Sequence, residues 1–157
     1  MNATRKILVP IDFSESSGAA LLYGRNLAKA FGAQLHVLHV MDNPFLRSTF
    51  KSTAAIELDM ANRMAERISP EDRTMLRTVS AVRISDDPYD EIIRYAEEEQ
   101  IDLIVMGTHG RGGVTRLLMG SVAEKVVRTA RCPVLTVRNP DHEFVTPDQT
   151  EVRHDRA

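Results

Sequence analysis

The amino-acid sequence predicts one α/β domain with an open five-stranded parallel sheet and helices on both of its faces. Short runs rich in valine, leucine and isoleucine alternate with segments of helical periodicity, in the order β-α-β-α-β-α-β-α-β. These runs are nearly continuous in apolar residues, as strands are when helices cover both faces of a parallel sheet. In such a sheet, ligands bind outside the carboxyl ends of the strands.

The first half of the chain predicts two strands and two helices. A strand over Lys6 to Ile11 is followed by Asp12 and Ser14, either of which can cap a helix from Glu15 to the residue before Gly32. The next strand is expected over Leu35 to Val40, and Met41 to Thr53 is expected to be a mobile loop. A helix ending at Pro70 is predicted from apolar residues at spacings of four, namely Ile56, Met60, Met64 and Ile68.

The second half predicts three strands and two helices. Arg77 to Ile84 alternates as a strand does, and Asp86-Asp87-Pro88 supplies a cap and a first-turn proline for a helix through Glu99. The most buried strand is expected over Ile101 to Met106. A last helix, Ser121 to Ala130, leads to a strand over Val134 to Val137. We therefore expect a domain over residues 1–138 and a polar, disordered tail over 139–157.

The composition of the chain indicates which kinds of molecule and compartment suit this protein. The 157 residues are 43% apolar and 27% charged, which suits one domain with its own core. The net charge of −2 gives no broad attraction to nucleic acid or to an anionic membrane surface. No apolar run approaches the roughly 20 residues that span a bilayer. The start of the chain lacks a secretion signal and Cys132 has no cysteine partner, so we expect a cytoplasmic protein.

A glycine-rich segment between a strand and a helix is the part of the sequence that most clearly indicates a ligand-binding site. It begins at Gly107, directly after the strand ending at Met106, and it ends at Gly120-Ser121, where the next helix starts. Glycine lets backbone N–H groups approach phosphate oxygens, and a helix N-terminus offers unpaired N–H groups. Asp12 ends the first strand, where a ribose or a metal-bound phosphate would lie. The segment predicts a polyphosphate site.

The alternative is that these glycines only turn the chain and that Ser121 and Asp12 only cap helices. The position between a strand and a helix, at the carboxyl edge of the sheet, favours binding. Two other nucleotide motifs fail: the P-loop pattern finds Gly113 where lysine is required, and the dinucleotide fingerprint finds Thr115 in place of its last glycine.

Three stretches of the chain resemble the ATP-binding branch of the universal stress protein family. They are Lys-Ile-Leu-Val-Pro-Ile-Asp-Phe-Ser at the first strand, the spacing Gly107-x2-Gly110-x9-Gly120-Ser121, and Cys-Pro-Val-Leu-Thr-Val at the last strand. The resemblance extends from about Lys6 to Arg138, and it departs from the family at Gly112-Gly113 and in the tail.

This resemblance implies a Rossmann-like fold, similar to that of the adenine nucleotide alpha hydrolases, and a site for ATP with Mg²⁺. Adenine would lie against the backbone near Val40, and the ribose and metal-bound phosphate near Pro10 and Asp12. Asp12 would reach the metal only through the bound nucleotide. The phosphates would lie on Met106, Gly107, Gly110, Gly120, Ser121 and Val122.

Several other residues are candidates for a functional site. Arg111 could donate charge-assisted hydrogen bonds to a triphosphate, with a plain surface arginine as the alternative. His109 lies in the same loop and is left out of the site. His36 and His39 are three apart on a strand, so they face opposite sides of the sheet and cannot share a metal. Cys132 is expected to pack in the core.

The sequence and the resemblance are compatible with two functions, and a third class of protein fits less well. The leading one is a nucleotide-responsive binding protein whose ATP-ordered surface is seen by an unidentified protein partner; the alternative is a slow ATPase or autophosphorylating enzyme. Nucleophile-elbow, metalloprotease and kinase signatures are missing, which favours binding over turnover. A PP-loop pyrophosphatase would need a glycine-rich loop after the first strand, where Asp12-Phe13-Ser14-Glu15 stands.

The last strand predicts self-association. Val134 to Val137 is expected at one edge of the sheet, and it carries no charge, proline or bulge that would block pairing. Two copies meeting about a two-fold axis would form a closed homodimer, which the family resemblance also implies.

Overall fold

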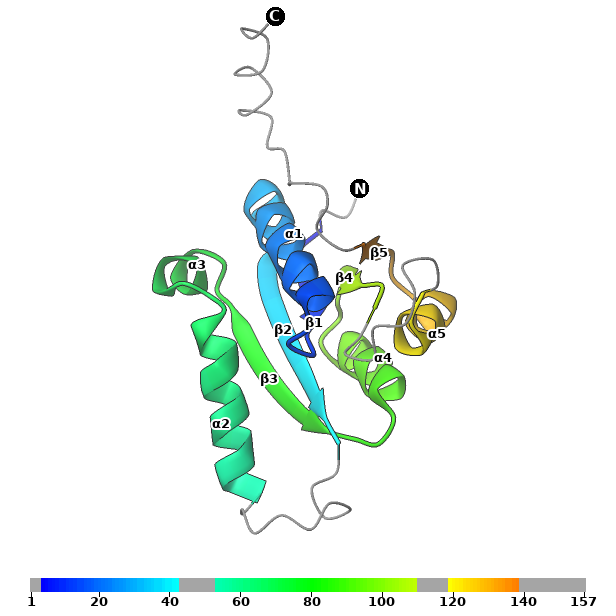
Figure 1. Cartoon of the computed structure of the whole chain (residues 1–157). Helices are drawn as coiled ribbons and strands as arrows, with labels where there is room; N and C mark the ends of the chain where they lie inside the picture. Colours follow the sequence, from blue (N-terminus) through cyan, green and yellow to red (C-terminus); the bar gives the residue numbers. More distant parts are fainter. Residues whose placement is uncertain (1–3, 43–52, 110–118, 139–157) are drawn as a thin grey trace, which may run out of the picture.

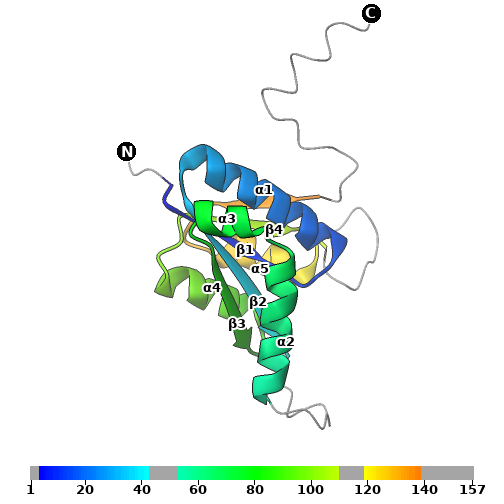
Figure 2. The same ribbon diagram turned by 90° about the vertical axis from the view of Figure 1, so that its left-hand side faces the viewer.

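The computed structural model describes residues 4–42, 53–109 and 119–138, which form a parallel sheet with helices on both faces (Figures 1 and 2). The strand order is β3-β2-β1-β4-β5. This confirms the predicted fold class. The elements are β1 (Lys6–Pro10), α1 (Glu15–Phe31), β2 (Gln34–Met41), α2 (Thr53–Glu66), α3 (Pro70–Met75), β3 (Val79–Ile84), α4 (Pro88–Glu98), β4 (Leu103–Gly107), α5 (Ser121–Thr129) and β5 (Val134–Val137).

Helix α3 is absent from the sequence-based prediction, which ended the preceding helix at Pro70 and placed a strand next. The Ser69 hydroxyl accepts the N–H of Asp72 at 3.1 Å, and Pro70 occupies the first helical turn. A proline ends one helix but is well tolerated at the start of another, so the same residue serves both.

Most of the predicted loop, residues 43–52, and the tail, 139–157, lie outside the described residues.

The most buried strand is at the centre of the sheet, and it is β1. Ile7, Leu8 and Val9 have no exposed surface, whereas Leu103 of β4 is only half-buried. The expectation that Ile101 to Met106 is the most buried strand is therefore wrong. Both strands are short apolar runs, and their order in the sheet depends on long-range packing that periodicity does not record.

Helix caps follow the expected residues in part. Ser14 is the N-cap of α1 and accepts the N–H of Ser17 at 3.2 Å, and Gly32 ends the helix in the left-handed conformation with φ 62°. Pro88 lies in the first turn of α4, as predicted. The predicted cap at that helix is wrong, because Asp87 occupies the N-cap position but its side chain makes no capping hydrogen bond.

Each face of the sheet has its own apolar core. On one face, side chains of β1 and β2 pack with those of α1 and α2, including Ile7, Val9, Leu35, Val37, Ala20 and Met64. On the other, Leu8, Leu38 and Ile104 pack with Ile92, Tyr95 and Val126 of α4 and α5. Figures 1 and 2 show α1 and the pair α4 and α5 on opposite sides of the sheet. Met64 is fully buried, while Met60 is only half-buried.

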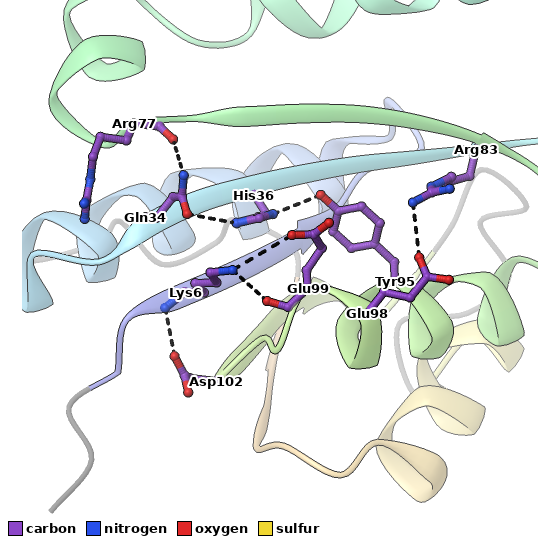
Figure 3. A network of polar contacts seen from close by, with 9 residues as sticks. All are labelled: Lys6, Gln34, His36, Arg77, Arg83, Tyr95, Glu98, Glu99 and Asp102. Atoms are coloured by element: carbon purple, nitrogen blue, oxygen red, sulfur yellow. Dashed lines mark hydrogen bonds and ion pairs between the residues drawn. The ribbon is translucent and has the colours of Figure 1, made fainter.

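Polar side chains tie the amino ends of the strands together (Figure 3). The Asp102 carboxylate accepts the N–H groups of Arg5 and Lys6 at 2.8 and 2.9 Å, and Lys6 Nζ donates to the Glu99 carbonyl at 2.8 Å. These bonds fix β1 against the turn that precedes β4.

His36 is the buried centre of this network, with 1% of its surface exposed. Gln34 Nε2 donates to the Arg77 carbonyl at 3.0 Å, so Gln34 Oε1 is left to accept from His36 Nε2 at 3.3 Å. His36 Nδ1 then accepts the hydroxyl of Tyr95 at 2.9 Å. Both ring nitrogens are thus satisfied in the neutral form, and burial lowers the pKa of His36 below its usual range.

Candidate functional site

A cavity of about 660 Å³ opens at the carboxyl ends of β1, β2 and β4. The chain runs outward from β1 to β2 and β3 on one side, whereas β4 and β5 lie on the other, so this is where the strand order reverses. Ligands of doubly wound sheets bind in that crevice. The volume lies within the range of sites for small molecules and cofactors.

The walls of the cavity differ from end to end. Next to β2 and α4 they are mainly apolar, from Leu38, Val40, Pro88 and Ile92, although His39 and Asp42 also line this part. Towards β4 and α5, backbone and small polar groups of Gly107, Thr108, His109, Gly120 and Ser121 line the cavity together with apolar side chains such as Met119 and Val122. A molecule with an apolar ring at one end and a polar or charged group at the other would match both walls.

The N-terminus of α5 faces this polar wall. Glu124 N–H is bonded to the Gly120 carbonyl at 3.0 Å, and the N–H groups of the first turn before it have no partner within the helix. Gly120 N–H donates to the Thr108 carbonyl at 2.6 Å, which ties the helix start to the end of β4. The arrangement presents helix-end N–H donors and the positive end of the helix dipole to a bound anion.

Asp12 reaches the cavity from a tight turn between β1 and α1. Its carboxylate accepts the N–H of Ser14 at 3.0 Å, and its own N–H donates to Ser17 Oγ at 3.3 Å. Phe13, between them, has the left-handed φ of 64°. Asp12 lines the cavity together with Pro10 and Ile11, and the two hydrogen bonds fix the turn that carries it.

Gly107 is required for a reason that sequence reasoning missed. A Cβ at this position would lie 2.3 Å from Ser16 Oγ and 2.8 Å from the Ser16 carbonyl oxygen, so the first turn of α1 fills the space beside it. Ser16 Oγ also accepts the N–H of His109 at 3.4 Å. Close packing of helix against strand therefore accounts for glycine here, independently of any phosphate.

Eight of the ten residues predicted to bind nucleotide line the cavity together. They are Pro10, Asp12, Val40, Met106, Gly107, Gly120, Ser121 and Val122. The other two, Gly110 and Arg111, lie outside the described residues. Sequence reasoning left His109 out, but the structure places it on the wall, with Nδ1 2.8 Å from the Thr108 hydroxyl.

Sequence reasoning also missed the α4 side of the cavity. Pro88 and Ile92 were assigned only to a helix, and Leu38 only to a strand. No motif marks them, because plain apolar residues become site residues only through the packing of α4 beside β2 and α5. The spacing of four between Pro88 and Ile92 on one helix face was the available signal.

The two strand histidines lie on opposite faces of the sheet, as predicted. His36 meets Tyr95 of α4, whereas His39 Nδ1 donates to the Ile11 carbonyl at 2.7 Å and its ring contacts Phe13. Cys132 is half-buried against the core of α4 and α5, and burial raises the pKa of its thiol. Among the described residues, no group of three His, Cys, Asp or Glu side chains could hold a metal ion.

The sheet topology and the cavity at its switch point define a doubly wound α/β protein with a cavity of ligand size. The chain belongs to the universal stress protein family, whose model matches residues 3–138. No helix in the described part of the chain has the length and apolarity to cross a membrane.

Individual relatives agree with this assignment. The chain is 36% identical to universal stress protein MJ0531 of Methanocaldococcus jannaschii, covering 90% of this chain and 86% of that protein. Among solved structures, universal stress protein UspA from Lactobacillus plantarum is 27% identical with a TM-score of 0.67, covering 88% of this chain and 100% of that one. A universal stress protein solved in complex with cAMP has a TM-score of 0.63 at 23% identity, covering 88% and 99%, a similarity that shows the fold alone.

Proposed function

We propose that the chain binds ATP in this cavity and acts in the stress response as a nucleotide-responsive binding module. The observation that carries the proposal is the polar wall itself, where Gly107, Gly120 and the N-terminus of α5 meet at the switch point of the sheet. Backbone N–H groups at a helix start bind phosphate without any basic side chain. This suits a chain whose overall charge offers no electrostatic attraction to anions.

The two ends of the cavity match the two ends of ATP. The base would lie between Val40 and the apolar side chains of α4, Pro88 and Ile92. The ribose would lie beside Pro10 and Asp12, and the phosphates along Gly107, Gly120 and Ser121. A universal stress protein of this fold was solved in complex with cAMP, and the proposal extends the adenine nucleotide class to this chain.

Magnesium would come with the nucleotide. Mg²⁺ would be bound mainly by the phosphates, and Asp12, in the turn after β1, would reach it only through the bound nucleotide. The ion would neutralise part of the phosphate charge. Asp12 would orient the metal-bound phosphates beside the ribose.

ATP is expected to raise the melting temperature. A ligand that binds only the folded state adds RT ln(1 + [L]/Kd), about 2.7 kcal/mol at a hundredfold excess over Kd, or roughly 5–10 °C for a domain of this size. Gly120→Val should abolish the shift, because the added branches would occupy the phosphate space. The measurement is a thermal melt with and without Mg-ATP.

Gly18→Val is the matched control, because Gly18 lies on α1 with nothing within 4 Å of its Cβ position and outside the cavity lining. It should keep the ATP shift. Wild-type protein that melts at the same temperature with and without Mg-ATP would refute the proposal. An undiminished shift in Gly120→Val would refute the placement of the phosphates.

A further inference from the structure

The backbone of Phe13 is in the left-handed region, with φ 64°. Large L side chains rarely adopt this conformation, because the Cβ crowds the following carbonyl group. Phe13 directly follows Asp12, which lines the cavity. A strained residue beside a binding site needs surrounding contacts that hold it there.

The Phe13 ring has such contacts with side chains of two elements, β2 and α2. The ring centroid of His39 on β2 lies 4.8 Å away, and the guanidinium carbon of Arg63 on α2 lies 4.2 Å from the Phe13 centroid. Arg67 adds a second guanidinium at 5.6 Å. A cation over an aromatic face is attracted by its quadrupole.

Both partners of the ring are themselves held in place. His39 Nδ1 donates to the Ile11 carbonyl at 2.7 Å, and Arg63 Nη1 lies 3.7 Å from Met60 Sδ. The cluster of Arg63, Phe13 and His39 therefore connects α2 to the turn after β1 through side-chain contacts.

The conformation of Phe13 determines where Asp12 lies. The hydrogen bonds from Asp12 N–H to Ser17 and from Ser14 N–H to the Asp12 carboxylate span this residue on both sides. If residue 13 left the left-handed region, the direction of the chain would change between Asp12 and Ser14. Both hydrogen bonds would then be lost, and with them the position of the carboxylate.

We propose that Phe13 is a positioning residue that holds Asp12 on the cavity wall, through a left-handed turn stabilised by the contacts of its ring with Arg63 and His39. The consequence for nucleotide rests on the proposed function: Asp12 meets the ribose and the metal-bound phosphate only while this turn is kept. Helix α2 thereby supports the site without lining it.

The test compares Phe13→Ala with Phe13→Gly. Both remove the ring, but only glycine adopts the left-handed conformation without strain. The turn should therefore persist in Phe13→Gly and relax in Phe13→Ala. A role in core packing alone predicts equal loss in both variants, or a larger loss with glycine.

The first readout needs no nucleotide. Hydrogen exchange of the Ser14 amide reports its bond to the Asp12 carboxylate, and it should speed up by about tenfold or more in Phe13→Ala while Phe13→Gly stays within about threefold of wild type. The second readout is the Kd for Mg-ATP, which should rise by about tenfold or more in Phe13→Ala and stay within about threefold in Phe13→Gly.

Arg63→Met tests the cation contact separately, since it removes the cation and keeps a long apolar side chain. It should weaken Mg-ATP binding about threefold in the wild-type background and have no effect in the Phe13→Gly background, where no ring remains to be held. Equal effects in the two backgrounds would overturn the role of the contact between Arg63 and Phe13.

The two proposals fail in different ways. If wild-type protein does not bind Mg-ATP but Ser14 exchange follows the predicted order, the ATP proposal fails and the role of Phe13 toward Asp12 stands. If wild type binds Mg-ATP and the two Phe13 variants match each other in exchange and in Kd, the role of Phe13 is overturned and the ATP proposal stands.

Discussion

At the scale of single residues, Gly107 and Ser16 mark the closest approach of α1 to the sheet. The first turn of α1 lies where a side chain at the end of β4 would otherwise project. Ser16 is buried, and its hydroxyl also holds the backbone of His109 at the polar wall of the cavity. Packing and binding therefore place requirements on the same short stretch of chain.

Gly107→Ala should destabilise the protein by about 1–3 kcal/mol, because the new Cβ overlaps the Ser16 backbone, which cannot rotate away. Urea unfolding in the absence of nucleotide measures this. Gly18→Ala is the control: its Cβ would meet open space in α1, so it should stabilise by about 0.5–1 kcal/mol. Equal unfolding midpoints for Gly107→Ala and wild type would contradict the close contact.

His36 should make stability depend on pH. Burial lowers the pKa of His36 in the folded protein. Below about pH 6.5 the unfolded chain therefore binds a proton at His36 while the folded protein keeps this side chain neutral. The stabilisation that neutral His36 gives is complete above that pH and is lost as the pH falls. The free energy of unfolding then decreases by at most about 1.4 kcal/mol per pH unit for one proton.

The variant His36→Gln isolates this effect, since it cannot take up the proton. Urea midpoints of wild type and variant at pH 7.5 and 5.5 give the measurement, and wild type should lose more stability between the two. An identical loss would show that His36 is not responsible. Tyr95, whose pKa burial raises to about 12, stays neutral throughout this range.

At the scale of elements, α3 is attached to α1 by a buried carboxylate. Asp72 is 4% exposed and is paired with Arg25 and with Lys29, the latter at 2.7 Å. The hydrogen bond from Lys29 holds the pKa of Asp72 below its usual range. Helix α3 has only six residues, so this tertiary contact rather than propensity stabilises it.

Asp72→Ala should therefore destabilise by roughly 2–3 kcal/mol, because Arg25 and Lys29 lose their hydrogen-bonded anion. Asp90→Ala removes an exposed pair with Arg94 on α4 and should change stability by at most about 0.5 kcal/mol. Thermal unfolding at neutral pH compares the two. Equal effects would mean that the buried pairing contributes no more than a surface one.

At the scale of the whole molecule, β5 is an edge strand, as the sequence predicts. The carbonyls of Pro133 and Val137 accept N–H groups from the β4 side. Because backbone groups alternate in direction along a strand, those of Thr136 point away from the sheet. Leu135 is 39% exposed on the same strand.

We propose that two copies pair through this edge as a homodimer. Thr136→Pro removes an outward donor without touching the β4 ladder, so it should give monomers in sedimentation velocity. Thr136→Val keeps the N–H and should remain dimeric. Wild-type protein that sediments as a monomer at micromolar concentration would contradict the proposal.

Local features of this protein can be predicted from its sequence. Alternating apolar runs and helical periodicity predicted every strand, and Ser14, Gly32 and Pro88 stand at the helix ends that they indicated. The ends of the glycine-rich segment also predicted the polar wall of the cavity. These features depend on residues a few positions apart, which is why they can be read along the chain.

Contacts between distant segments follow from the folded structure alone. It has β1 at the centre of the sheet, Pro88 and Ile92 at the cavity, and Phe13 in contact with His39 and Arg63. It also added helix packing as a reason for glycine at position 107. Each of these depends on contacts between residues far apart in the chain, whose formation is governed by the packing of the whole core rather than by the residues on either side.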